Sequence, residues 1–132
     1  LCVATMEQIG AANLINVPDE YFVETKNEYL KRRDVVYNAL KNMDDVVCEQ
    51  PHGAFYVVAK LPVKNAEDFV VWLLREFDID NETLMMAPAE GFYATKGLGR
   101  DEVRISYCLN VNDLERAMYI LNEALKVYPG RK

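Results

Sequence analysis

The feature that most constrains the fold is a helical pattern that runs without a break from Asp19 to about Asn42. Apolar or aromatic residues recur at every seventh position within it: Phe22, Tyr29, Val36 and Met43. At 1.5 Å per residue, about 25 helical residues span roughly 36 Å, which is more than one small domain needs. A helix of this length more often bridges two bodies than covers one sheet, so the pattern predicts a connecting helix.

Three strand patterns and two helix patterns follow. Strands are expected at about 54–60, in "TLMMAPA" up to Pro88, and around Arg104. Asn65 is expected to cap the first helix, and Asn112 with Glu115 resembles a capping box for the last helix. The order β-α-β-β-α predicts an α+β fold with a small, mostly antiparallel sheet and helices packed on one face.

The composition argues against nucleic acids and membranes as partners. The net charge of −6 and the absence of a basic patch argue against nucleic acid. There is no apolar run long enough to cross a bilayer and no secretory signal, so we expect a cytoplasmic protein without a membrane partner. Cys2, Cys48 and Cys108 lack metal-ligand spacing, which predicts reduced, mostly buried thiols and no metal site.

The stretch "DEVRISYCLN" places an arginine in the middle of a strand. Four residues alternate as its apolar face: Val103, Ile105, Tyr107 and Leu109. Arg104 therefore points to the opposite face, where its planar guanidinium could bind a carboxylate through two parallel hydrogen bonds. The carboxylate could belong to an acidic residue of the protein, as in an ordinary surface salt bridge, or to a ligand.

Other candidates for chemistry are weaker. His52 is the only histidine and has no nucleophile in a recognisable motif beside it, which favours a solvent-facing turn. Gly97 and Gly99 precede a strand and lack G-x-G-x-x-G spacing, which favours a flexible loop over a phosphate site. Trp72 lies off the main apolar stripe of its helix, so it could contact another domain or subunit.

Four stretches together resemble one family: "EYLKRRDVVYNAL", "PHGAFYVV", "LMMAPAEGF" and "GRDEVRISYCLNVNDLERAMYIL". In order and spacing they are similar to class I/II aminotransferases, the fold-type I pyridoxal-phosphate enzymes related to aspartate aminotransferase. The resemblance covers essentially the whole chain. It implies that residues 17–132 form the small C-terminal domain, with the helix at about 19–42 as the interdomain connector. Residues 1–16 would end the large-domain or connector segment, and their apolar helical pattern predicts burial against further chain upstream.

The resemblance assigns Arg104 to the substrate's α-carboxylate. It implies transfer of an amino group from an amino acid, with an aspartate-like donor as first hypothesis, to a 2-oxo acid by a homodimer. Pyridoxal 5'-phosphate and its Schiff-base lysine would belong to a large domain upstream, and no S-x-x-K-like segment occurs in residues 1–132. We therefore expect no catalytic, cofactor-binding or metal-binding residue in this chain, which alone would be inert.

The family often has glycine after the proline and after the phenylalanine of its A-P-G-x-x-F-G segment. Here Ala89 follows Pro88 and Tyr93 follows Phe92, so the shape of this loop is open. Three alternatives stay open as well. The chain could be a ferredoxin-like domain with a small-molecule-binding or regulatory role. It could be part of another fold-type I enzyme, a lyase or synthase. It could also be an inactive dimerisation or scaffolding domain in which Arg104 forms a structural ion pair.

Overall fold

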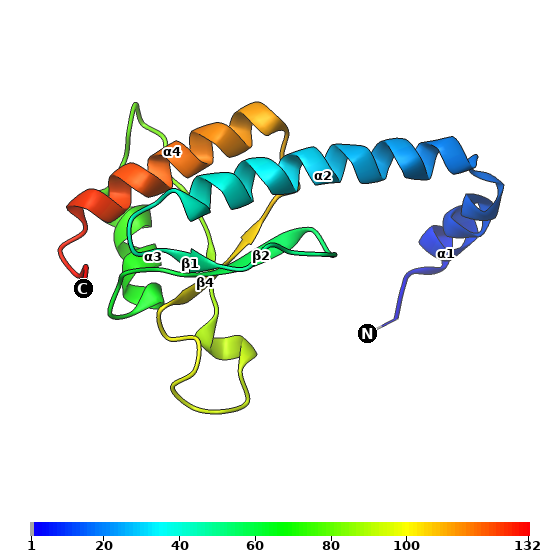
Figure 1. The fold of residues 1–132 in the computed structure, drawn as a ribbon. Helices are drawn as coiled ribbons and strands as arrows, with labels where there is room; N and C mark the ends of the chain where they lie inside the picture. Colours follow the sequence, from blue (N-terminus) through cyan, green and yellow to red (C-terminus); the bar gives the residue numbers. More distant parts are fainter. Residues whose placement is uncertain (1) are drawn as a thin grey trace.

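The computed structural model describes residues 2–132, which form a small antiparallel sheet with helices on one face and a long helix that extends beyond it (Figure 1). The elements are, in order, α1 (Thr5–Ala12), η1 (Asn13–Asn16), α2 (Asp19–Lys41), β1 (Val47–Cys48), β2 (Tyr56–Lys60), α3 (Ala66–Glu76), β3 (Ala87–Pro88), η2 (Glu90–Phe92), β4 (Glu102–Ser106) and α4 (Val111–Val127). The strand order is β1-β2-β4-β3, and all neighbouring strands are antiparallel. The predicted α+β class is confirmed. Strand β1 was not predicted, because two residues are too few to show an alternating pattern.

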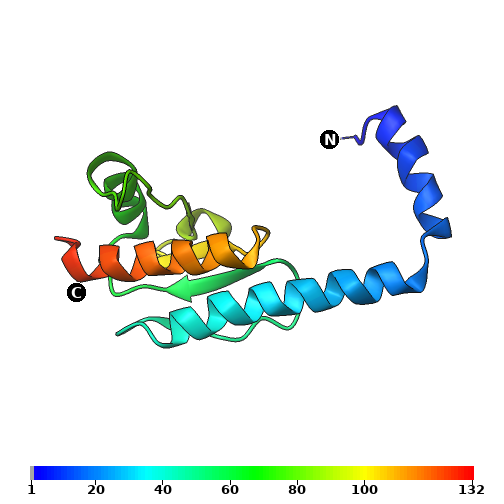
Figure 2. The ribbon, with the colours of Figure 1, turned by 90° about the horizontal axis from the view of Figure 1, so that it is seen from above.

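The long helix forms as predicted, but its two halves have different surroundings. Val36 and Leu40 are fully buried, whereas Phe22 near the start of α2 is 52% exposed. Figure 2 shows the first half of α2 running beyond the sheet and α4, with α1 at its far end. Helix α1 contains no buried residue. Burial along the seven-residue repeat therefore increases from exposed Phe22 through half-buried Tyr29 to fully buried Val36.

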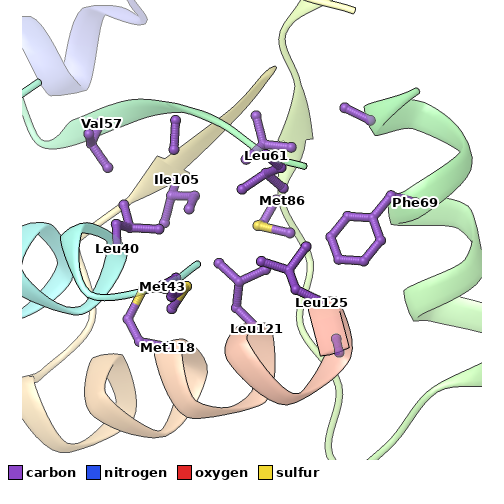
Figure 3. Close-up of a cluster of buried hydrophobic side chains, with 14 of the residues drawn as sticks. Leu40, Met43, Val57, Leu61, Phe69, Met86, Ile105, Met118, Leu121 and Leu125 are labelled. Atoms are coloured by element: carbon purple, nitrogen blue, oxygen red, sulfur yellow. The ribbon is translucent and has the colours of Figure 1, made fainter. Parts of the chain in front are cut away.

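The hydrophobic core lies between the sheet and the helices (Figure 3). In β2 and β4 every second residue is buried, so Val57 and Ile105 face the helices and their neighbours face away. Leu121 of α4 and Phe69 of α3 reach the same interior. Complete burial of one such side chain contributes about 1.5–3 kcal/mol. No α-helix of the described chain packs on the opposite face of the sheet.

The two predicted helix caps have different outcomes. Asn65 caps α3, because its Oδ1 accepts a hydrogen bond of 2.9 Å from the backbone N–H two residues on. The capping box of Asn112 and Glu115 is wrong. Helix α4 begins two residues earlier than this box predicts, with Asn110 as its cap, whose Oδ1 accepts from the Asp113 N–H at 3.0 Å. The backbone of Asn110 is extended, and its side chain caps the N–H of the third helical residue, as an N-cap does. Asn112 is the second residue of the helix and so cannot be its cap.

Two further expectations are corrected. Leu109 is 56% exposed, because β4 ends at Ser106 and the chain turns toward α4. The three thiols are free but not mostly buried: Cys2 and Cys108 are exposed, and Cys48 is half-buried. Cys2 precedes α1 and Cys108 lies in a connecting loop, so neither has a core to enter. Burial raises the pKa of the Cys48 thiol.

Trp72 packs within this body. Its ring centroid lies 5.1 Å from those of Phe77 and Tyr128, and 6.1 Å from that of Phe69. The side chain lies off the main stripe of α3 because the end of α4 and the residues after α3 cover that side. No partner is needed to explain its position.

No helix in residues 2–132 is both long enough and apolar enough to span a membrane.

Lys132, at the end of the chain, forms a salt bridge with Asp101, the residue before β4. Lys132 Nζ donates to Asp101 Oδ2 at 2.6 Å, and Lys60 Nζ lies 3.6 Å from the same oxygen. Burial raises the pKa of the Asp101 carboxyl, but the hydrogen bond and charge of Lys132 and the charge of Lys60 outweigh it and hold this pKa below its ordinary 3.8. Because the carboxyl is more acidic in the folded protein, its contribution to stability is present above pH 3.8 and is lost as pH falls further.

We expect Asp101→Asn to lower the free energy of unfolding by about 1 kcal/mol at neutral pH, since it removes one charged hydrogen bond with exposed partners. The difference from the unmutated protein should shrink below pH 3.8 as Asp101 becomes protonated. Urea unfolding at neutral pH and at about pH 3 measures both values. A difference that stays constant across this range would contradict the role of the ionised carboxylate.

Candidate functional site

Arg104 lies at the centre of the open face of the sheet. Its strand, β4, is flanked by β2 and β3, and Arg104 stands opposite Val58 of β2 and Ala87 of β3. Val103 and Ile105 on either side of it are buried under the helices. Arg104 therefore points away from the core, as the alternation predicted, and its side chain is half-buried among neighbours on the open face.

Two aromatic rings contact the guanidinium. The Arg104 Cζ lies 4.4 Å from the ring centroid of Phe92, which follows β3, and 5.2 Å from that of Tyr56 in β2. Cation–π contacts of this kind contribute about 0.5–1 kcal/mol at exposed sites and more when desolvated. They involve the π-faces of the rings and use none of the guanidinium's directed N–H bonds. The N–H groups of Arg104 therefore stay available for a planar acceptor.

Arg104 has no acidic partner among residues 2–132. The other half-buried arginines each lie within 3.4 Å of a carboxylate oxygen: Arg32 of Glu28, Arg33 of Asp34, Arg116 of Asp80 and Glu82, and Arg131 of Asp45. No side-chain N or O atom in the described part of the chain is both buried and without a hydrogen bond, so the unpaired N–H groups of Arg104 remain open to solvent. A cation that is partly desolvated and accessible is ready to bind an anion.

A shallow hollow of about 590 Å³ lies beside this position on the same face. It is lined by residues of β1, the following turn and β2, together with Tyr93 and Glu102. Tyr56 belongs both to this lining and to the surroundings of the guanidinium. Space for the rest of a small ligand therefore adjoins Arg104.

Sequence reasoning did not find the residues that surround Arg104. Tyr56 has a weak signal, since its position in β2 places it on the same face, but this required the register between β2 and β4. Phe92 has no periodic signal, because it ends the short η2 turn. The contacts between these side chains depend on the paths of two segments distant from β4 in sequence.

The remaining candidates lie elsewhere. His52 is exposed in the turn before β2, as predicted. Gly97 and Gly99 both have positive φ, of 85° and 71°, and a strand follows them. This geometry fits a loop, in agreement with the sequence. Across the described chain there is no group of three or more His, Cys, Asp or Glu that could hold a metal ion.

Comparison with known proteins identifies the class. The family model for aminotransferases of class I and II matches residues 1–121. The chain therefore belongs to the class I and II aminotransferase family. It is 30% identical to an aspartate aminotransferase of Pyrococcus horikoshii over 94% of this chain and 31% of that protein. It is 35% identical to an LL-diaminopimelate aminotransferase of Oleidesulfovibrio alaskensis over 76% of this chain and 24% of that protein.

A solved structure shows the same fold. The alanine aminotransferase of Pyrococcus furiosus superposes with a TM-score of 0.75 at 27% identity, over 96% of this chain and 31% of that one. The chain thus spans about a third of the length of the relatives it matches. These relatives are named for three different amino donors, namely aspartate, LL-diaminopimelate and alanine.

Enzymes of this family use pyridoxal phosphate, so its fit to this chain can be tested. A lysine that forms a Schiff base must lose its proton, which burial or a neighbouring cation promotes. All eight lysines of the described chain are exposed: Lys26, Lys31, Lys41, Lys60, Lys64, Lys96, Lys126 and Lys132. The residues present therefore do not fit as the anchor of this cofactor.

Proposed function

We propose that the chain is the small C-terminal domain of a pyridoxal-phosphate-dependent aminotransferase, in which Arg104 binds the α-carboxylate of the substrate. One observation carries the proposal. Arg104 is the half-buried arginine without a carboxylate partner within residues 2–132, and it lies on the face of the sheet that no α-helix covers. Membership of the family supports the type of reaction.

Arg104 would act by binding and orientation. A carboxylate that meets the guanidinium edge-on forms two parallel hydrogen bonds, which fix both its position and its plane. The rings of Phe92 and Tyr56 limit the rotation of the guanidinium before the substrate arrives. Holding a reactant in one orientation can lower a barrier by several kcal/mol. The group that is bound is common to all α-amino acids, so Arg104 does not by itself select the donor.

The organisation of the chain supports a domain boundary. Residues 17–132 would be the small domain, with α2 as the connector, and residues 1–16 would belong to the segment that leads from a large domain. The large side chains at the start of α2, Tyr21, Phe22 and Val23, are more than half exposed, as are those of α1. A surface of this kind suits contact with a large domain, which we propose also holds the cofactor and its lysine.

We propose a homodimer in the cytoplasm for the intact enzyme, on the basis of the family and of the free thiols. Aspartate remains the first hypothesis for the donor, since the relative from P. horikoshii is an aspartate aminotransferase.

We expect the intact protein that carries this chain, supplied with pyridoxal phosphate, to transfer an amino group from L-aspartate to 2-oxoglutarate. Oxaloacetate formation measures the reaction, and parallel assays with L-alanine and LL-diaminopimelate test the donors in the names of the relatives. Activity with another of these donors would correct the substrate and keep the reaction class. The donor could instead lose its α-hydrogen or its side chain while no amino group reaches the oxo acid. That result would show that the enzyme is a lyase or a synthase.

A further inference from the structure

The loop that carries Phe92 differs from the usual family segment at the next residue. Where the family often has glycine, this chain has Tyr93. Its Oη donates a hydrogen bond of 2.6 Å to Oε2 of Glu102, the first residue of β4. Glu102 precedes Arg104 by two positions, so both side chains lie on the open face of the sheet. The departure from the family pattern thus forms a contact beside the proposed carboxylate site.

Glu102 holds both ends of the η2 turn. At the start of the turn, its backbone carbonyl accepts a hydrogen bond of 2.9 Å from the Ala89 N–H. At the other end, its carboxylate accepts the bond from Tyr93. Within the turn, the Phe92 N–H donates to the Ala89 carbonyl at 2.9 Å. Phe92 is therefore enclosed between two anchors that share one residue of β4.

The Glu102 carboxylate has no other side-chain partner in residues 2–132. Lys60 stands opposite Glu102 in the register of β2 and β4, but its ammonium lies 3.6 Å from Oδ2 of Asp101. The hydrogen bond to Glu102, burial and the Glu102 charge all raise the pKa of Tyr93, so its hydroxyl remains a donor across the neutral range.

Gly99 makes room for the Tyr93 ring. It has a φ of +71°, and a Cβ added there would clash with Cε2 of the Tyr93 ring. Gly99 is buried although it lies in a surface loop, because the ring covers it. The chain thus combines a tyrosine at one end of the loop with a glycine at the other, and the two pack directly together.

We propose that Tyr93 is a positioning residue for Arg104: its hydrogen bond to Glu102 fixes the η2 turn and so holds the Phe92 ring against the guanidinium. The inference rests on the proposed function of Arg104 and extends it to Tyr93, which acts on the guanidinium through Phe92. Loss of the Tyr93 hydroxyl frees one end of the turn, and Phe92, which is 59% exposed, then samples positions away from Arg104. The guanidinium loses its preferred orientation, while its charge remains.

The first test is kinetic, in the intact protein with L-aspartate and 2-oxoglutarate. Tyr93→Phe removes only the hydroxyl, and we expect KM for the amino acid to rise about threefold to tenfold, the equivalent of one hydrogen bond, with kcat nearly unchanged. Tyr119→Phe is the matched control, since Tyr119 is similarly exposed and contacts Arg116 on α4 instead. It should leave KM unchanged.

The second test needs no catalysis. In NMR spectra of the 132-residue chain, the Phe92 ring 4.4 Å from the Arg104 Cζ should shift the Arg104 Nε–H resonance. Phe92→Leu defines the value without the ring. We expect Tyr93→Phe to move the resonance toward that value and Tyr119→Phe to leave it in place.

The results separate the two levels of the proposal. If Arg104→Lys leaves KM unchanged, the proposed function of Arg104 is wrong, whatever Tyr93 does. If Arg104→Lys raises KM but Tyr93→Phe changes neither KM nor the Arg104 resonance, the positioning role is overturned and the carboxylate site stands. A Tyr93→Phe protein in which kcat falls and KM stays constant would also overturn it, because orientation of the carboxylate would then not be what was lost.

Discussion

Arg104→Lys in the intact protein should weaken binding of the amino acid on the order of 100-fold. Lysine keeps the positive charge but presents an ammonium, which cannot form two parallel hydrogen bonds with one carboxylate. Removal of one partner from a buried, hydrogen-bonded charge pair costs about 2–5 kcal/mol, and each 1.4 kcal/mol is tenfold in affinity. The shorter reach of the ammonium into the space between Phe92 and Tyr56 adds to the loss.

The measurement is KM for L-aspartate, together with the dissociation constant of a dicarboxylate that has no amino group to transfer, such as maleate. Arg75→Lys is the matched control, because Arg75 is exposed on α3, away from the open face. An Arg104→Lys protein whose affinity equals that of the control would remove Arg104 from the binding site. Arg104 would then serve only to pack Phe92 and Tyr56 on the sheet.

Phe69→Ala should lower the free energy of unfolding of this chain by about 3–5 kcal/mol. The side chain is completely buried and lies 4.9 Å, between ring centroids, from Tyr128 and 6.1 Å from Trp72. Its removal leaves a cavity where α3 joins the end of α4, and the surrounding backbone cannot close over the whole volume. Small domains are stable by only about 5–15 kcal/mol, so the variant should lose a large part of its stability.

Trp72 is the only tryptophan, and its fluorescence reports the packing of this aromatic cluster during unfolding in urea. Phe22→Ala removes the same side chain from a site that is 52% exposed, and its stability should stay within about 0.5 kcal/mol of the starting protein. If Phe69→Ala and Phe22→Ala lowered the free energy of unfolding equally, the buried Phe69 ring would stabilise the protein no more than the exposed Phe22 ring.

The sequence predicted the parts of the fold that depend on local periodicity. Residues 19–42 form a helix because helix-forming residues continue without a breaker, and the structure has this helix over Asp19–Lys41. The cap at Asn65 could be predicted because it is local. The side-chain oxygen of Asn65 accepts a hydrogen bond from a backbone N–H only two residues further along the chain. The direction of Arg104 followed from the alternation of Val103 and Ile105, since a strand of period two leaves no other choice.

Predictions failed where two residues in the same segment could serve as the helix cap, where the end of a strand was not marked in the sequence, and where the strand was very short. Asn110 and Asn112 are both good caps, and the choice depends on where β4 ends and how the chain enters α4. Leu109 continues the alternation of β4 in sequence, but the strand had already ended. Strand β1 exists because β2 pairs with it, and a two-residue strand carries no pattern of its own.

What the sequence alone determined is the longer helices α2, α3 and α4, the strands β2 and β4, and the face of the sheet on which Arg104 lies, because these follow from interactions between residues near one another in the chain. Tertiary structure alone decided what surrounds the guanidinium. Tyr56 and Phe92 come from segments on either side of α3, and the hydrogen bond of Tyr93 to Glu102 spans a loop whose path depends on Gly99. These contacts depend on strand register and loop geometry, which the whole packed body fixes and no local pattern records.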